Sequence, residues 1–429
     1  ADGSSKFGAN NKWAFFPSFA AAWRINQEKF MKNIDWISNL KIRGSWGVTG
    51  NQNIPAYSSP EKMNTYTYPI GGVTSVGIGA GNMPNPDLKW ETTAITDIGV
   101  DLGVFNNRIN FTADYYYKKT TDLLWNISVP LTTGFSSVLK NIGSLQNKGL
   151  ELSLSADVLT GPFKWNTMLN WSTNKNKVLE IPGYIPTQQG SISGHLKVNG
   201  SWLEPGLPVG VWNLLKTNGV MRTEKEWQDA ARVADSNFDK IGDMSFVDKN
   251  GDGKISFGED RQIVGDPNPD FIFGWTNNFS YKNFDLSVYI NGSVGNDIYN
   301  VLRAETNIVS AWGNQRADVK DRWTANNPNG KYPRAHVLVN QNLLQSDYLI
   351  EDGSFLRIQN VTLGYTFSKV SFLRSLRIYA TAQNLLTITG YSGYNPEVNS
   401  QGQSNLQLGV DYNAYPTARS FILGINIGF

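Results

Sequence analysis

The sequence predicts an all-β fold, a transmembrane antiparallel β-barrel of about eleven strands with long loops on one side of the membrane. Three observations predict it. Apolar and polar residues alternate with a period of two in segment after segment, the links between these segments are short and long in turn, and the last segment alternates up to an apolar C-terminus. Together they favour strands with one apolar and one polar face.

The alternation is clear in residues 109–118, 150–158 and 284–291. In the first of these, odd-numbered positions carry Ile, Phe, Ala and Tyr, whereas most even-numbered positions carry Asn, Thr, Asp or Lys. Successive side chains of a strand point to opposite faces, so this period separates the two residue classes in space. Comparable patterns predict further strands at residues 15–25, 40–48, 98–104, 165–171, 271–281, 361–367, 376–382 and 419–429.

The links predict which end of each strand faces which side of the membrane. Outer-membrane barrels have short periplasmic turns and long extracellular loops, whereas a soluble sandwich need not sort its loops in this way. The link at residues 26–39 falls on the periplasmic side, and we expect a short helical turn in it. The tight links are residues 105–108, 159–162, 282–283 and 368–375, and the long links are residues 49–90, 120–147, 173–270, 292–354 and 387–418.

Composition excludes several other classes of protein. The 429 residues carry a net charge of only +2, which gives no electrostatic footprint for nucleic acid. No run of about 18 apolar residues occurs, so a membrane-spanning helix is not predicted. The mean hydropathy of -0.34 is compatible with strands that are apolar on one face only. Without cysteine, disulfide scaffolds and thiolate sites are excluded.

The last predicted strand, residues 419–429, carries a candidate insertion signal. Its alternating apolar residues end on a terminal aromatic residue, which resembles the C-terminal signal read by the barrel-insertion machinery. That machinery is therefore an expected partner. The signal residues are Phe421, Leu423, Ile425, Ile427 and Phe429.

The strand count predicts an incomplete barrel. About eleven strands is an odd number, whereas bacterial single-chain barrels close with an even number. Unpaired backbone groups at an open sheet edge cost several kcal/mol each in lipid, so partner strands are expected from elsewhere. The first strand runs towards the periplasm in this topology, which assigns residues 1–12 to an extracellular loop.

An ordered set of short phrases covers most of the chain. Examples are Gly-Ser-Trp-Gly-Val-Thr-Gly-Asn-Gln at residues 44–52 and Asn-Pro-Asp-Leu-Lys-Trp-Glu at residues 85–91. The set resembles the SusC/RagA-like family of TonB-dependent outer-membrane transporters. The other phrases are residues 2–8, 16–18, 147–151, 248–253, 265–269 and 382–385.

This resemblance implies a nutrient importer of the outer membrane of a Gram-negative bacterium, and not an enzyme. In that family a barrel of about 22 strands encloses a plug. Residues 1–429 match only the C-terminal part of such a barrel. The implied partners are the N-terminal half of the same transporter with its plug and remaining strands, TonB through that half, and a SusD-like surface lipoprotein that acts as a lid. The implied substrate is a glycan or an oligopeptide.

One local motif predicts a metal ion. Residues 248–259, inside the long extracellular loop expected at residues 175–270, match the EF-hand calcium-loop pattern position by position. The flanking residues do not resemble an EF-hand helix pair, and an Asp/Asn/Gly-rich turn without an ion is the alternative. Side-chain or carbonyl oxygens for Ca²⁺ would come from Asp248, Asn250, Asp252, Lys254, Ser256 and Glu259.

Other functions stay open at this point. Long loops suit a structural or adhesive surface barrel or a porin equally well. A barrel-associated hydrolase is less favoured, because no nucleophile elbow or metal-hydrolase helix occurs. His195 and His336 are expected to be ordinary loop residues. Four loop tryptophans are expected to pack loops singly or to line a binding vestibule together, namely Trp202, Trp212, Trp227 and Trp312.

Overall fold

The structure is a computed structural model that forms two compact units. Unit 1 comprises Ala1–Leu152 and Asn174–Ile185, and unit 2 comprises Ser153–Thr173 and Pro186–Phe429. The structure describes residues 1–181, 187–192, 198–308, 314–338, 340–367, 373–400, 402, 406–412 and 414–429.

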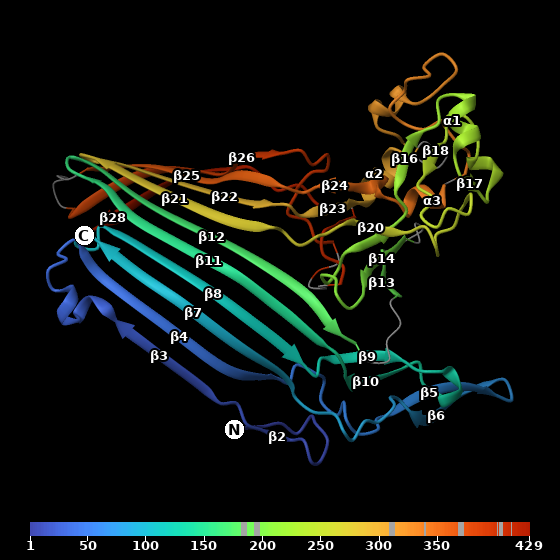
Figure 1. Cartoon of the computed structure of the whole chain (residues 1–429), viewed down its shortest axis with the longest axis horizontal. Coiled ribbons are helices and arrows are strands. Elements are labelled where there is room, and N and C mark those ends of the chain that lie inside the picture. Colours follow the sequence, from blue (N-terminus) through green and yellow to red (C-terminus); the bar gives the residue numbers. More distant parts are fainter. Residues whose placement is uncertain are drawn as a thin grey trace. The chain divides into compact units, whose positions relative to one another are not determined.

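The main element is one antiparallel sheet of eleven strands (Figure 1). Each strand lies beside its neighbours in chain order, which confirms the predicted all-β class and the strand count. Every predicted segment overlaps one observed strand, although residues 15–25 and 419–429 extend beyond β3 and β28. The strands are β3 (Ser18–Arg24), β4 (Ile37–Asn51), β7 (Glu91–Val104), β8 (Ile109–Thr121), β11 (Ser144–Thr160), β12 (Phe163–Glu180), β21 (Phe271–Tyr281), β22 (Phe284–Val294), β25 (Phe355–Phe367), β26 (Ser375–Thr389) and β28 (Ser420–Gly428).

The register of unit 2 gives the sheet an apolar and a polar face. Residues directly opposite one another share a face. One row across six strands is wholly apolar, and it runs through Trp165, Phe279, Leu286, Leu363, Ala380 and Leu423. The neighbouring row on the other face begins with Lys164, Ser280 and Asp285. The apolar face is open to the surroundings, since Leu363 is 51% and Leu423 is 84% exposed.

Glycines on the polar face make room for ion pairs that cross a strand. In unit 1 the Arg43 guanidinium on β4 reaches Asp114 on β8 at 2.6 Å across β7. A Cβ at Gly99 of β7 would lie 2.1 Å from Asp114 Oδ1, so only glycine leaves this path free. In unit 2 the pair between Asp285 and Arg377 crosses β25 in the same way, over Gly364.

The short links have the predicted form. Between β7 and β8, Asn106 and Asn107 both adopt a left-handed backbone with φ of 58°, which Asn tolerates better than most residues. Lys282, in the two-residue link between β21 and β22, has φ of 52°. The link at residues 26–39 contains helical turns, as predicted, formed by η1 (Ile25–Gln27) and η2 (Lys29–Met31).

The long links and the residues before β3 contain small elements of their own. The short strands are β1 (Asp2–Gly3), β2 (Trp13–Ala14), β5 (Met63–Ile70), β6 (Val73–Ala80), β9 (Leu124–Ser128), β10 (Ser137–Asn141), β13 (Thr187–Ile192), β14 (Val198–Leu203), β15 (Trp212–Leu214), β16 (Thr217–Val220), β17 (Arg232–Val233), β18 (Met244–Phe246), β19 (Lys254–Ile255), β20 (Gln262–Gly265), β23 (Asp297–Asn300), β24 (Ile350–Asp352) and β27 (Val410–Asp411). The helices are α1 (Glu224–Asp229), α2 (Val301–Thr306) and α3 (Gln341–Leu344), with 3₁₀ turns η3 (Leu131–Thr133), η4 (Ser236–Phe238), η5 (Ala317–Asp321) and η6 (Asp347–Leu349).

Two long links of unit 2 pack into what we call the loop body, the described residues within 211–265 and 297–352. Its apolar core joins residues from both links and includes the fully buried Leu214, Leu215 and Leu344. The Thr217 backbone N–H and hydroxyl both donate to Asp347 Oδ1, at 2.8 and 2.7 Å. Burial raises the pKa of the Tyr348 hydroxyl to about 12. The two links therefore form one packed structure.

No helix among the described residues is both long enough and apolar enough to cross a membrane.

Candidate functional site

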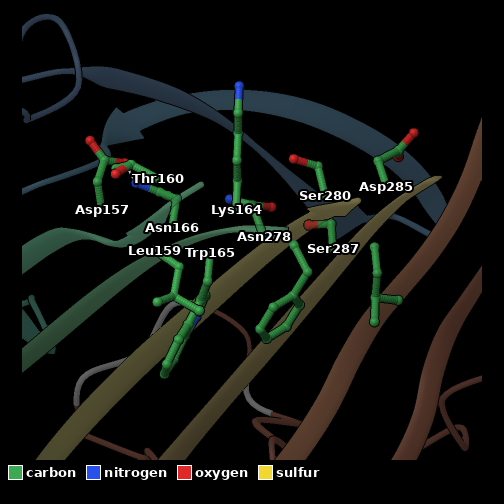
Figure 2. Close-up of a pocket in the computed structure, with 12 residues that line it drawn as sticks. Asp157, Leu159, Thr160, Lys164, Trp165, Asn166, Asn278, Ser280, Asp285 and Ser287 are labelled. Carbon is green, nitrogen blue, oxygen red and sulfur yellow. Dashed lines mark hydrogen bonds between the residues drawn. The ribbon is translucent and has the colours of Figure 1, made fainter. Parts of the chain in front are cut away.

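The polar face of unit 2 is hollowed where β11, β12, β21 and β22 meet their tight links (Figure 2). The depression has a volume of about 460 Å³, and eight of its twelve lining residues are polar. Figure 2 shows Lys164, Ser280 and Asp285 projecting to one side of the strands and Trp165 to the other. The period-two pattern of the sequence thus gathers polar side chains on one side of the strands that border this hollow.

Hydrogen bonds hold the polar side chains of this hollow in place. Asn166 Nδ2 donates to Asp157 Oδ1 at 3.0 Å, between adjacent strands. Arg377 donates through two nitrogens to Asp285, at 3.0 and 2.5 Å, in the bidentate geometry that fixes both groups. Such a surface can hold water or a polar solute by hydrogen bonding.

The calcium-loop motif folds through its own side chains. Asp248 accepts hydrogen bonds from the backbone N–H groups of Gly251 and Gly253, both at 2.7 Å. Asn250 Oδ1 accepts from the Asp252 N–H at 3.0 Å, and Asp252 Oδ1 accepts from the Lys254 N–H at 2.8 Å. These bonds wrap the chain around the oxygens of the motif.

The second half of the motif is anchored to the loop body. Ile255 is buried and pairs with Val233 in a parallel bridge between β19 and β17. The fully buried Asp260 accepts from the N–H groups of Lys249 and Ser256, at 3.0 and 2.7 Å. Asp260 lies one residue beyond the pattern and was missed by sequence reasoning, since its role depends on burial.

The last ligand positions of the motif lie close to the first ones. Glu259 Oε2 accepts from Asn250 Nδ2 at 3.4 Å, and Ser256 Oγ accepts from the Glu259 N–H at 3.3 Å. Within the described ranges no three Asp, Glu or His side chains are grouped as a metal site. The donor set that fits Ca²⁺ therefore has to combine carboxylates with the Asn250 amide and the Lys254 carbonyl, which are oxygen ligands that Ca²⁺ accepts.

The described loop tryptophans pack against the protein. Trp202 is 5% exposed, donates from Nε1 to Glu204 at 2.7 Å and lies under the Arg261 guanidinium. Trp212 belongs to the core of the loop body, and Trp227 Nε1 donates to Asp239. Packing therefore accounts for these three, whereas Trp312 lies outside the described residues, as does His195.

His336 is more than an ordinary loop residue. Its Nε2 lies 2.6 Å from Oδ1 of Asp243, whose side chain is fully buried. Arg334 Nε lies 2.7 Å from the same oxygen. Sequence reasoning missed this cluster, because 93 positions separate Asp243 from His336 and no spacing motif links them.

Comparisons with known proteins give one consistent set of relatives. The family model described as TonB dependent receptor-like, beta-barrel matches residues 1–253. TonB-dependent receptor P3 of Formosa agariphila is 37% identical over 438 residues, which cover 100% of this chain and 43% of the relative. TonB-dependent receptor SusC of Bacteroides thetaiotaomicron is 34% identical, with 100% and 41% covered.

Solved structures agree with this fold. The structure of the RagAB peptide transporter matches with a TM-score of 0.84 at 24% identity, over 100% of this chain and 44% of that chain. The RagAB peptide importer in its 'open-open' state matches with a TM-score of 0.78 at 23% identity, over 99% of this chain and 44% of that chain. The chain thus spans less than half the length of these relatives.

Proposed function

Because this chain belongs to the TonB-dependent receptor-like β-barrel family, we propose that it supplies the C-terminal part of the barrel of an importer in the outer membrane of a Gram-negative bacterium. The observation that carries the proposal is the register of one eleven-stranded sheet, which in unit 2 gathers exposed apolar side chains on one face and polar side chains on the other. Lipid suits the first face and a water-filled lumen suits the second.

The partners follow from the same family. We propose that the N-terminal half of the transporter supplies the plug, the remaining strands and the contact with TonB, and that a SusD-like lipoprotein covers the extracellular mouth. The substrate is a glycan or an oligopeptide, and the peptide alternative is supported by the RagAB structures, which are those of a peptide transporter. In this orientation the link between β12 and β21 is extracellular, and it begins later than the predicted residue 175 because β12 continues to Glu180.

Uptake of labelled oligosaccharides and oligopeptides by cells with and without the gene tests import. An importer loses uptake both on gene deletion and when an uncoupler collapses the proton gradient that powers TonB. Uptake that survives the uncoupler favours a porin, and unchanged uptake in the deletion strain favours an adhesive barrel. Release of product by the purified protein would instead favour a hydrolase.

We further propose that residues 248–259 bind Ca²⁺ and stiffen the extracellular loop. Calorimetric titration of the purified protein with CaCl₂ is expected to give binding heat, and Asp248→Ala and Glu259→Ala are expected to abolish it, because each removes a carboxylate ligand. Asp260→Asn is expected to weaken binding about tenfold, because Asp260 orients the loop without being a ligand. Asp229→Ala, an exposed carboxylate on α1, is the control; no heat in the parent protein ends the calcium proposal.

The C-terminal residues carry a separate proposal. Phe421, Leu423, Ile425, Ile427 and Phe429 are between 51% and 86% exposed, on the strand β28 and directly after it. We propose that the barrel-insertion machinery reads these residues during assembly, before lipid covers them.

A further inference from the structure

A small polar cleft lies where β25 and β26 meet the link that leads to β28. Its volume is about 230 Å³, below the range of about 300–1,000 Å³ typical of pockets that enclose whole small molecules, so it fits the end group of a larger ligand. Its lining includes Arg357, Tyr394, Asn395, Thr417 and Arg419.

Arg357 forms the fixed wall of the cleft. Its side chain is only 6% exposed and forms an ion pair with Glu397. Nε donates to Thr387 Oγ1 at 3.0 Å, and a terminal nitrogen donates to Asn395 Oδ1 at 2.9 Å. All three guanidinium nitrogens are thus engaged and the charge is balanced, so Arg357 shapes the cleft and leaves ligand recognition to other groups.

Two asparagines fix the backbone that presents Arg419. Asn395 Nδ2 donates to Thr417 Oγ1 at 2.9 Å, and Asn384 Nδ2 donates to the Ala418 carbonyl at 2.9 Å. Asn384 holds its position with a left-handed backbone, φ 52°. The two residues directly before Arg419 are therefore tied to the loop and to β26.

Arg419 itself is exposed, and its guanidinium has no ion pair or hydrogen bond within the part of the chain that the structure describes. The Thr417 and Tyr394 hydroxyls line the same cleft and can donate. An arginine on an anchored backbone with hydroxyl donors beside it can bind carboxylate, sulfate and phosphate groups.

We propose that this cleft binds the oxyanion end group of a ligand, with Arg419 as its charged contact. The oxyanion belongs either to a soluble acidic ligand or to a lipid headgroup. The inference does not depend on import, because binding is measured without an energised membrane.

Calorimetry on the purified protein separates the two sources. The soluble acidic probes are trigalacturonate and capped triglutamate, and their neutral partners are trigalactose and capped triglutamine. The lipid probe is a nanodisc that contains bisphosphorylated lipid A, and its neutral partner is a nanodisc without it. We expect one acidic probe to bind more tightly than its neutral partner. Arg419→Gln is expected to raise the dissociation constant of that acidic probe about tenfold or more. Arg419→Lys should retain part of the affinity, since lysine keeps the positive charge but lacks the planar guanidinium that can donate two parallel hydrogen bonds to one oxyanion.

Arg24→Gln on β3 is the matched control, because Arg24 is exposed and the same charge is removed in unit 1. The proposal is overturned if Arg419→Gln changes the dissociation constant of no acidic probe by more than threefold. It is also overturned if that variant weakens the binding of neutral and acidic probes alike, or if Arg24→Gln weakens binding of the acidic probe equally. If Arg419→Gln weakens binding of the acidic soluble probe, the ligand is soluble. If it weakens binding of the lipid A nanodisc, the ligand is a lipid headgroup.

Discussion

The Asp243→Ala variant is expected to lose about 3 kcal/mol of stability in the loop body. Asp243 is fully buried and faces Arg334 and His336 at 2.7 and 2.6 Å. Its second oxygen accepts the Lys240 N–H at 2.9 Å. Removing the carboxylate leaves Arg334, which is only 26% exposed, without its counterion, and this residual cost exceeds the modest net value of the intact pair.

Hydrogen exchange measured by mass spectrometry checks this expectation, since it reports opening of the loop body separately from the barrel. A loss of about 3 kcal/mol corresponds to exchange on the order of a hundredfold faster in the protected amides of the two packed links. Asp229→Ala is the control. It breaks the ion pair between Lys225 and Asp229, whose side chains are 83% and 63% exposed. This variant should change the amide exchange rates less than about threefold. Equal effects of the two variants would contradict a special role for the buried cluster.

The strands could be predicted because one face of the sheet is apolar. Residues 271–281 have the predicted bounds, since their alternation runs from the first paired residue to the last. Residues 165–171 were a correct but short prediction, because β12 continues to Glu180. Residues 173–177 are all polar, so the contrast between faces ends while the backbone still pairs. Alternation reports the environment of side chains and not hydrogen bonding of the backbone.

The resemblance to SusC/RagA-like transporters is confirmed by the matched family and relatives, which are receptors and not enzymes. The loop body could not be predicted in the same way. Asp243 and Arg334 form a buried pair although they are distant in the chain. Asp260 is buried and accepts hydrogen bonds from backbone N–H groups. Neither periodicity nor motif spacing records such contacts. The sequence pattern of the calcium loop was visible, whereas the residue that anchors it was not.

Leu423→Arg is expected to destabilise the membrane-inserted barrel by about 2–4 kcal/mol, whereas Ile422→Arg should cost less than about 1 kcal/mol. Leu423 lies opposite Ala380 on the apolar face, and the next residue, Ile422, lies opposite Thr381 on the polar face. The same residue type is introduced at adjacent positions of β28, so the chemistry is matched and only the face differs. Unfolding by guanidinium in phospholipid vesicles gives both free energies.

The two substitutions also separate a membrane strand from an edge strand in water. Leu423 is 84% and Ile422 is 43% exposed. In water an arginine at the more exposed position costs almost nothing, and the half-buried position would be the more sensitive one, so the order of the two effects reverses. Phe429→Ser separates folding from assembly, because it lies beyond the end of β28, where a polar residue costs little once the barrel is inserted. If the terminal residues are the insertion signal, that variant keeps its stability in vesicles and loses folded protein in cells.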